Sequence, residues 1–284
     1  MKPVKGVQSP VISGVQGHDT GWSPEPLIVV QDLTMAFGSN VVQQDLTFTI
    51  NRGDVFIVMG GSGCGKSTLM KNLIGLHRPQ KGRVFYDAIS FWDGDEMERR
   101  RILRRVGVMY QGGALWSSMT LAENITLMIR EYTNVDAAQA QELASLKLAL
   151  VGLAGFEDYY PSEISGGMKK RASIARAMSL DPEILFLDEP SGGLDPISAR
   201  MLDDLILQLK ESLNTTVVVI THELASIFAI GNNSVFLDTE TKTMIASGHP
   251  RRLLEECENN TVRRFLTRGE APATGQAKDA RCLL

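Results

Sequence analysis

The sequence has few cysteines and no long apolar run, and these absences exclude several classes of protein. Its 284 residues include three cysteines, Cys64, Cys257 and Cys282, and no CxxC pair. We therefore expect no disulfide scaffold and a reducing compartment. No apolar stretch approaches the roughly 18 residues that a membrane-spanning helix needs. Residues 1–26 also lack the apolar centre of a secretory signal, so the sequence predicts a cytoplasmic chain.

The charge balance is close to neutral, with a formal net charge of −4. Such a balance provides no overall attraction to nucleic acid or anionic lipid. The run ERRRILRRV (Glu98–Val106) nevertheless holds five arginines within seven residues. Acidic residues precede this run, and no aromatic side chains alternate with it as base-stacking platforms would. We interpret it as the solvated face of a helix and expect no nucleic-acid partner.

Short β-type runs alternate with helical segments along the chain. Runs such as LIVV, VFIVM, ILFLD and TTVVVI predict strands, and a helix is expected to begin at Lys66. The pattern between Gln111 and Pro182 is mainly helical. This alternation predicts an α/β core with a largely parallel sheet, whose ligands bind at the carboxyl ends of the strands.

Changes in composition divide the chain into three parts. Residues 1–26 are rich in Gly, Pro, Ser and Gln and predict a flexible arm. A core domain is expected over residues 27–255, with a helical subdomain at about 112–180. Residues 256–284 are expected to form a C-terminal extension that is partly helical and then disordered.

A glycine-rich stretch, GGSGCGKST, directly follows the run VFIVM. A strand, the pattern G-x-x-x-x-G-K-[ST] and a helix together form the P-loop that binds nucleoside triphosphates. The glycines let backbone N–H groups approach an anion, and the helix directs its positive end at the phosphates. Lys66 is expected to bridge the β- and γ-phosphates, and the Ser67 hydroxyl to bind Mg²⁺. The residues expected to touch the nucleotide here are Gly61, Ser62, Gly63, Cys64, Gly65, Lys66, Ser67 and Thr68.

Two acids end the apolar run ILFLDEP (Ile184–Pro190). On their own they would be read as the end of a strand before a turn. Beside a P-loop, Asp188 is instead expected to bind Mg²⁺, and Glu189 to polarise the attacking water as the catalytic base. A kinase or small GTPase does not need an acid at position 189, whereas a hydrolase does.

A third motif narrows the class. In SEISGGMKKR (Ser162–Arg171), the residues Ser165, Gly166 and Gly167 open a predicted helix shortly before ILFLDEP. With the P-loop and the paired acids, this stretch resembles the nucleotide-binding subunits of ATP-binding-cassette (ABC) transporters, whose signature commonly reads LSGGQ. The resemblance covers residues 27–255 and implies a P-loop NTPase fold with a RecA-like core, an antiparallel β subdomain and a helical subdomain.

The resemblance also implies the roles of residues outside the P-loop. Phe37 corresponds to the aromatic residue that stacks on adenine, although core packing is a real alternative for a lone aromatic. Gln111 corresponds to the Q-loop glutamine that touches Mg²⁺ and senses the membrane partner. Asp195, in SGGLD, belongs to the D-loop at the dimer interface, and His222 corresponds to the catalytic histidine that contacts the γ-phosphate.

The same resemblance implies a pair of subunits. Ser165, Gly166 and Gly167 of one copy would close over the ATP held by the other, so a homodimer or a partner chain is expected. Two departures from the family pattern stand out. Met168 replaces the usual glutamine, which is not expected to abolish activity, and Gly192-Gly193 is expected to make the D-loop more mobile.

Three further stretches resemble the Mla-type branch of the family: YQGGALWSSMTLAENI, the signature ending in Met168, and DEPSGGLDPISA. This branch implies phospholipid trafficking between inner and outer membranes, with a transmembrane permease, an Mce-domain lipid-binding protein and a small accessory subunit. The chain would then sit peripherally on the cytoplasmic face of the inner membrane. Leu115 and Trp116 are equally compatible with permease docking and with the helical subdomain's own core.

Two other classes of function remain open at this point. One is an ABC ATPase for another transported substrate, such as an amino acid or a metal. The other is a soluble ABC ATPase of DNA repair or translation. Repair members carry long coiled coils and translation factors carry two cassettes, and the sequence has neither feature. Lys66 and Glu189 are both present, so a binding-only role is not favoured.

Overall fold

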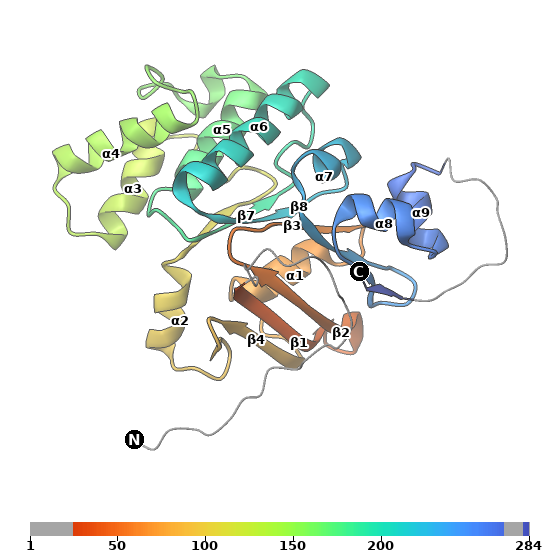
Figure 1. Cartoon of the computed structure of the whole chain (residues 1–284). Coiled ribbons are helices and arrows are strands. Elements are labelled where there is room, and N and C mark those ends of the chain that lie inside the picture. Colours follow the sequence, from red (N-terminus) through yellow and green to blue (C-terminus); the bar gives the residue numbers. More distant parts are fainter. Residues whose placement is uncertain (1–24, 270–280, 284) are drawn as a thin grey trace.

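The computed structural model describes residues 25–269 and 281–283. These residues form two sheets with helices packed around them (Figure 1). The smaller sheet is antiparallel, in the order β2-β1-β4-β5. Its strands are β1 (Pro26–Phe37), β2 (Asn40–Asn51), β4 (Lys81–Tyr86) and β5 (Ile89–Ser90).

The larger sheet is mostly parallel, in the order β11-β10-β9-β3-β8-β7-β6. Within it, only the pair β9 and β10 is antiparallel among the described strands. The strands are β3 (Val55–Gly60), β6 (Val106–Met109), β7 (Ile184–Asp188), β8 (Thr216–Ile220), β9 (Asn233–Leu237), β10 (Met244–Ser247) and β11 (Cys282–Leu283). The predicted α/β fold with a largely parallel sheet is confirmed.

Helices cover the larger sheet on both faces. They are α1 (Lys66–Leu73), α2 (Glu96–Leu103), α3 (Leu121–Tyr132), α4 (Ala137–Leu150), α5 (Gly166–Ala177), α6 (Pro196–Leu213), α7 (Leu224–Ile230), α8 (Pro250–Glu256) and α9 (Asn260–Leu266), with a 3-10 turn at Pro161–Glu163. Among the residues described, no helix is long and apolar enough to cross a membrane.

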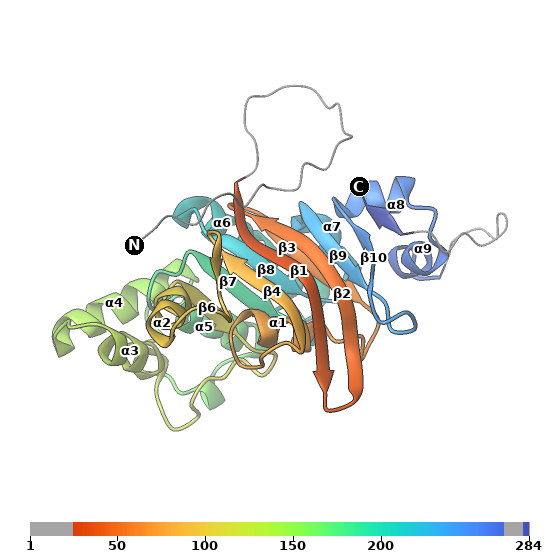
Figure 2. The ribbon, with the colours of Figure 1, turned by 90° about the horizontal axis from the view of Figure 1, so that it is seen from below.

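Alternation along each central strand divides the interior into two hydrophobic cores. In β3, Val55, Ile57 and Met59 belong to the core shared with helices α3 to α9. Phe56 and Val58 belong to the second core, shared with α1 and the smaller sheet. This alternation follows from the two-residue period of a strand. Figure 2 shows the smaller sheet lying across the larger one on the α1 side.

Several helices begin at side chains that bind their free N–H groups. Thr120 and Glu123 form a capping box at the start of α3, and Asp136 and Gln139 form another at α4. At α2, the Asp95 carboxylate accepts a hydrogen bond from the Glu98 N–H at 2.8 Å. Each cap satisfies N–H groups that have no partner inside the helix, so these boundaries are encoded locally.

Helix α5 lies unusually close to β6 and to the loop that follows it. A Cβ added at Gly107 in β6 would lie too close to the Ala177 carbonyl oxygen of α5. A Cβ added at Gly113 would lie 2.5 Å from the Ser173 Oγ, and Gly113 has a φ of +80°. Both positions therefore require glycine, and α5 is held against this segment along its length.

Two expectations for the ends of the chain need correction. Strand β1 begins at Pro26, inside the predicted arm; the rest of that arm, residues 1–24, lies outside the described residues, as does most of the predicted disordered tail. The tail is not disordered at Cys282–Leu283, which pair with β10. A disulfide joins Cys282 to Cys257, against the expectation from cysteine usage, because the strand pairing brings their Cα atoms to 5.7 Å.

We predict that Gly107→Ala lowers the free energy of unfolding by about 1–3 kcal/mol, because the new methyl group overlaps backbone that cannot move without displacing α5. Denaturant unfolding measures the change. Gly112→Ala is the matched control, since a Cβ at that position meets no atom within 4 Å. Equal stability of the two variants would contradict the close packing of α5 on β6.

Candidate functional site

The candidate site lies where three parallel strands of the larger sheet end. Strand β8 pairs with β3 on one side and with β7 on the other, with Val58 and Asp188 both opposite Ile220. The loops after these strands carry the glycine-rich stretch, Glu189 and His222. The register therefore brings three motifs that are far apart in sequence to one edge of the sheet.

The glycine loop joins β3 to α1, and its glycines meet two different needs. Gly60 (φ +147°) lies against the carbonyl of Leu237, and a Cβ at Gly65 (φ +98°) would lie 2.7 Å from Val42. These two glycines are required by the protein's own neighbours. Gly63 (φ +76°), by contrast, has no atom within 4 Å of a Cβ placed on it, so its backbone is open to an approaching ligand.

Lys66 and Cys64 are fixed by contacts inside the loop. The Lys66 Nζ donates hydrogen bonds to the carbonyl oxygens of Gly60 at 2.9 Å and Gly61 at 3.0 Å. These contacts hold the ammonium against the start of the loop, next to where phosphates would bind. Cys64 is buried, and burial raises the pKa of its thiol, which leaves a neutral small side chain beneath the loop.

Ser67 and Asp188 meet across the site, although 121 residues separate them in sequence. The Ser67 hydroxyl donates to Asp188 Oδ1 at 3.4 Å. Burial, reinforced by the charge of Glu189, raises the pKa of the Asp188 carboxyl. Mg²⁺ prefers one or two protein oxygens completed by phosphate and water, so this pair fits Mg²⁺ beside a bound triphosphate. Among the described residues there is no cluster of three or more His, Cys, Asp or Glu that would hold a metal unaided.

Glu189 and His222 form the second pair. His222 Nδ1 lies 2.7 Å from Glu189 Oε1, and the Thr221 hydroxyl donates to Glu189 Oε2 at 3.3 Å. Glu189 has a φ of +49°, a left-handed conformation that is uncommon for a residue with a side chain. Such backbone strain is typical of a functional position. The carboxylate is thereby aimed across the loop at the histidine ring.

A hollow of 870 Å³ lies over the glycine loop, while Cys64 and Asp188 are not among its lining residues. Gln111 lines it with the glycine loop, Glu189 and His222. Five further residues line it that sequence reasoning did not identify: Val42 of β2, Leu224 of α7, and Arg264, Phe265 and Arg268 in and just after α9. Phe265 is fixed by edge-to-face packing on Phe236 at 5.1 Å. No local motif marks these five, because only the folded chain brings β2, α7 and α9 to the hollow.

Phe37 ends β1 and is 53% exposed. This exposure argues against the alternative that Phe37 packs in the hydrophobic core. Its ring meets the His77 ring edge-on, with centroids 5.5 Å apart. Phe37 is not among the described residues that line the hollow, so an adenine ring would reach it only by extending beyond the phosphate cradle.

The signature residues lie apart from the hollow of their own chain. Ser165 caps α5, accepting a hydrogen bond from the Met168 N–H at 3.3 Å, with Gly166 and Gly167 in the first turn. None of the three lines the described part of the hollow. Met168 is partly buried and packs against the hydrophobic core. Its apolar side chain therefore contributes to packing, whereas the glutamine usual at this position would place a polar group there.

Asp195 is also outside the hollow. It caps α6, and its Oδ1 accepts from the N–H groups of Ile197 and Ser198, both at 3.0 Å. A hydrogen bond from the Ser198 side chain, together with these two N–H groups, holds the Asp195 pKa below its usual range. Asp195 thus has a defined structural role in the single chain, in addition to any contact with a second copy.

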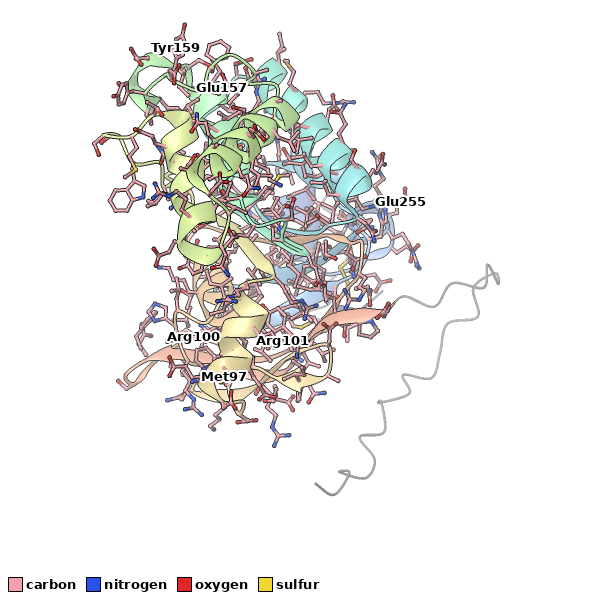
Figure 3. All side chains as sticks on the ribbon, turned by 90° about the vertical axis from the view of Figure 1, so that its left-hand side faces the viewer. Met97, Arg100, Arg101, Glu157, Tyr159 and Glu255 are labelled. Atoms are coloured by element: carbon pink, nitrogen blue, oxygen red, sulfur yellow. A yellow bond between two sulfur atoms is a disulfide. The ribbon has the colours of Figure 1, made fainter. Side chains whose placement is uncertain are left out.

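The first part of the arginine run lies on α2, Arg104 and Arg105 follow the end of that helix, and none of the run lines the described hollow. Figure 3 labels Met97, Arg100 and Arg101 on the outer side of this helix, and Met97 is 80% exposed. Arg100 pairs with Glu96 of the same helix at 2.6 Å, whereas Arg105, beyond the helix, is partly buried and pairs with Glu183 at 2.7 Å and with Asp87. The interpretation of a solvated helix face therefore holds for Arg100 and Arg101, and it is wrong for Arg105, which joins a partly buried network of ion pairs.

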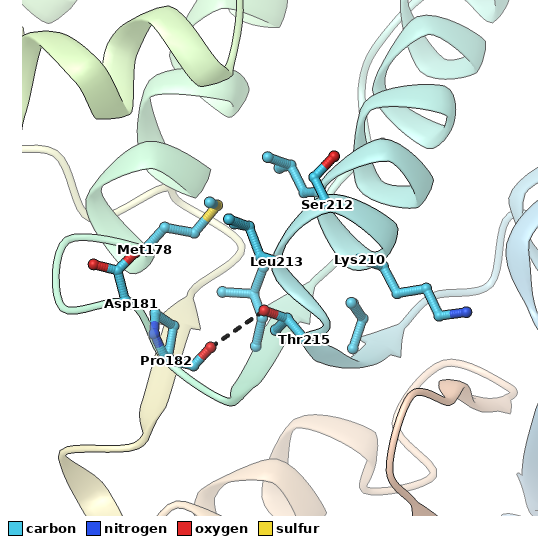
Figure 4. Close-up of a pocket in the computed structure, with 10 residues that line it drawn as sticks. Met178, Asp181, Pro182, Lys210, Ser212, Leu213 and Thr215 are labelled. Carbon is cyan, nitrogen blue, oxygen red and sulfur yellow. Dashed lines mark hydrogen bonds between the residues drawn. The ribbon is translucent and has the colours of Figure 1, made fainter.

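A second cavity, of 350 Å³, lies at the opposite edge of the sheet (Figure 4). It is lined by residues that precede β7 and β8, including Pro182 and Thr215, whose hydroxyl donates to the Pro182 carbonyl at 3.3 Å. Because ligands of such sheets bind at the carboxyl ends of the strands, this cavity is not the reaction site.

Comparison with known proteins agrees with the geometry. Residues 43–192 match the model of the family described as ABC transporter. A probable ribonucleotide transport ATP-binding protein, mkl, of Mycobacterium tuberculosis is 38% identical over 88% of this chain and 71% of its own length. The intermembrane phospholipid transport system ATP-binding protein MlaF of Haemophilus influenzae is 32% identical over 87% of this chain and 92% of its own length. MlaF of Escherichia coli K12 is 31% identical, covering 84% of this chain and 88% of its own.

Solved structures share the same fold. The dimeric bacterial ABC transporter cassette MJ0796 superposes with a TM-score of 0.71 at 27% identity, covering 78% of this chain and 98% of its own. A second structure of that cassette is described as bound to ADP and phosphate after hydrolysis. The family match spans more than half of the chain, and the relatives exceed 30% identity over most of it. The chain therefore belongs to the ABC transporter family, and it is an ATP-hydrolysing cassette of the Mla type.

Proposed function

We propose that this ATPase powers a transporter that moves phospholipid between the inner and outer membranes. The observation that carries the proposal is the similarity to the two MlaF proteins, which extends over about nine tenths of their length. The stretch YQGGALW and the signature ending in Met168, both typical of that branch, agree with it. The chain would bind at the cytoplasmic face of the inner membrane.

The proposed assembly contains two copies of the chain, a transmembrane permease, an Mce-domain lipid-binding protein and a small accessory subunit. The position of Ser165, Gly166 and Gly167 supports the pairing. They head an exposed helix end outside their own hollow, where N–H groups and a positive helix end are available to the phosphates of a second copy. Two such contacts would enclose two ATP molecules.

We infer a division of labour among the residues of the hollow. The open backbone at Gly63 and the Lys66 ammonium hold the triphosphate. Ser67 and Asp188 would hold Mg²⁺, which supplies charge neutralisation at the β- and γ-phosphates. Glu189 polarises the attacking water and accepts its proton, and His222, 2.7 Å away, orients that carboxylate and reaches the γ-phosphate side.

The permease would dock beside the loop that follows Gln111. Trp116 is 55% exposed there, whereas Leu115 is partly buried against the core. The Trp116 backbone is held by Asn124, whose Oδ1 accepts from the Trp116 N–H at 2.7 Å. A large aromatic side chain kept outside by a fixed backbone is suited to anchor a partner helix. These observations favour docking by Trp116 and a core role for Leu115.

A second substrate class has a specific observation in its favour. The mkl relatives, at 38% identity, are described as probable ribonucleotide transport proteins.

The proposal of phospholipid transport is tested by isolating the native complex from membranes and identifying its permease and bound molecules by mass spectrometry. Co-purifying phospholipid and an Mce-domain partner support it. A complex that lacks both and retains nucleotides in its transmembrane part favours the alternative.

We predict that Lys66→Ala weakens ATP binding by about 10- to 100-fold, because a charge-assisted contact with the phosphates is lost. Equilibrium binding of ATP measures the change. Lys81→Ala, which removes an exposed cation on β4, is the matched control and leaves affinity unchanged. Wild-type affinity in Lys66→Ala would disprove the assignment of the loop.

Glu189→Gln should bind ATP normally but hydrolyse it about 10²-fold or more slowly, because glutamine cannot accept the proton of the attacking water. It should also accumulate an ATP-bound dimer, seen by size-exclusion chromatography. The control is Glu223→Gln, the neighbouring carboxylate 3.9 Å from His222. A Glu189→Gln variant that turns over at the wild-type rate would mean that another group is the base.

Trp116→Ala should lose binding to the permease while its melting temperature stays within about 2 °C of wild type, because the side chain is exposed. Co-purification and thermal unfolding are the two measurements. Tyr132→Ala, another exposed aromatic of the helical subdomain, should keep the permease. A lower melting temperature with assembly intact would instead place Trp116 in the core.

A further inference from the structure

A single ammonium joins three segments of the site. Lys170, on α5, donates from Nζ to the carbonyl oxygen of Gln111 at 3.1 Å and to that of Glu189 at 3.0 Å. Gln111 follows β6, Glu189 follows β7, and α5 is the helix that Ser165 caps. The contact thus connects the Q-loop, the proposed base and the signature helix of one chain.

The partial burial of Lys170 makes its two hydrogen bonds important for stabilising the ammonium. The side chain is partly buried, and burial lowers the pKa of its ammonium, against the raising effect of the nearby Glu189 and Asp188 charges. A partly buried ammonium is stabilised chiefly by hydrogen bonds to its N–H groups. Both acceptors of the Lys170 ammonium are backbone carbonyls, so removing the ammonium also leaves two carbonyl groups without this donor.

The packing of α5 keeps Lys170 in place. Positions 170, 173 and 177 lie at intervals of three and four residues, so they share one face of the helix. Ser173 packs on Gly113 of the Q-loop, and Ala177 packs on Gly107 of β6, both too closely for a Cβ at either glycine. The side of α5 that carries Lys170, Ser173 and Ala177 therefore packs along β6 and the loop after it, and Lys170 is the charged residue at one end of this contact.

At Glu189, the same contact fixes an unusual backbone. The Glu189 N–H donates to the Ile220 carbonyl at 2.8 Å, while its own carbonyl accepts from the Lys170 ammonium at 3.0 Å and from the Gly192 N–H at 3.2 Å. The residue is held at both peptide groups in a left-handed conformation, with φ +49°. This backbone sets where the carboxylate points, which is toward His222. Without the Lys170 ammonium, only the longer hydrogen bond from Gly192 would hold this carbonyl, so Glu189 would be freer to move away from that geometry.

We propose that Lys170 is a positioning residue for ATP hydrolysis, which fixes the backbones of Glu189 and Gln111 and ties them to the helix that carries Ser165, Gly166 and Gly167. The inference rests on the proposed role of Glu189 as the base. It predicts that the ammonium affects the hydrolytic step more than the binding of ATP, because Lys170 contacts backbone carbonyls and does not itself line the described hollow.

The test is Lys170→Met, which keeps the length and apolar stem of lysine but has no donor. In the full-length chain, kcat should fall about 10- to 100-fold, because the base is no longer held in place. The Kd for ATP should stay within about threefold of wild type. Lys169→Met is the matched control, since Lys169 is the preceding residue, is exposed and makes no side-chain hydrogen bond among the described residues; it should hydrolyse ATP normally.

A double-mutant cycle separates positioning from a general loss of structure. In a Glu189→Gln background, where the base is already absent, Lys170→Met should reduce the residual rate by no more than about twofold. An equal, additive loss in both backgrounds would overturn the proposal, as would a wild-type kcat in the single variant. Loss of ATP affinity in parallel with the melting temperature would also overturn it, by showing a structural role alone.

Two further measurements keep the outcome interpretable. If Lys170→Met does not fold, Lys170→Gln is used, because its amide is polar but too short to reach both carbonyls. Glu189→Gln alone checks the premise: if that variant hydrolyses ATP at the wild-type rate, the role of Glu189 fails. If Glu189→Gln is inactive and Lys170→Met is fully active, only the inference about Lys170 fails.

Discussion

The parallel register of β3, β8 and β7 is the constraint on which the rest of the structure depends. It makes three loops leave the sheet at one edge, so that groups from residues 60–67, 188–189 and 221–222 meet within hydrogen-bond distance. Both faces of these strands are covered by apolar cores. A shift of the register by one residue would exchange those faces and separate the loops, so core packing and site geometry are specified by the same pattern.

The functional residues that could be predicted from the sequence are those that belong to a short, continuous motif. The run of strand, glycine loop and helix at residues 55–73 predicts a phosphate-binding loop, and Asp188 and Glu189, at the end of β7, predict its metal side. What escaped prediction depends on distant neighbours. Gly60 is needed because Leu237 lies against it, and Gly65 because Val42 does, which the motif alone does not reveal. Arg264, Phe265 and Arg268 reach the hollow only after α9 packs on β9.

The cysteines illustrate the same limit. Their spacing excludes a compact metal or disulfide motif, yet the structure pairs Cys257 with Cys282 across 25 residues, because β11 adds to the free edge of β10. Pairings of this kind follow from sheet topology and have no local pattern. By contrast, the helix starts at Asp95, Thr120, Asp136 and Ser165 are local, since each is set by one side chain and the N–H groups beside it.

The separation of Ser165 from its own nucleotide hollow has a consequence for enzymology. In the proposed dimer, each complete site takes residues from two polypeptides, so the number of working sites depends on how many chains are associated. The turnover per chain would then rise with the concentration of enzyme, steeply while most chains are single and then to a plateau. Tethering by a membrane partner would raise the local concentration of the two copies, so a dilute solution and an assembled transporter would differ in rate with no change in any residue.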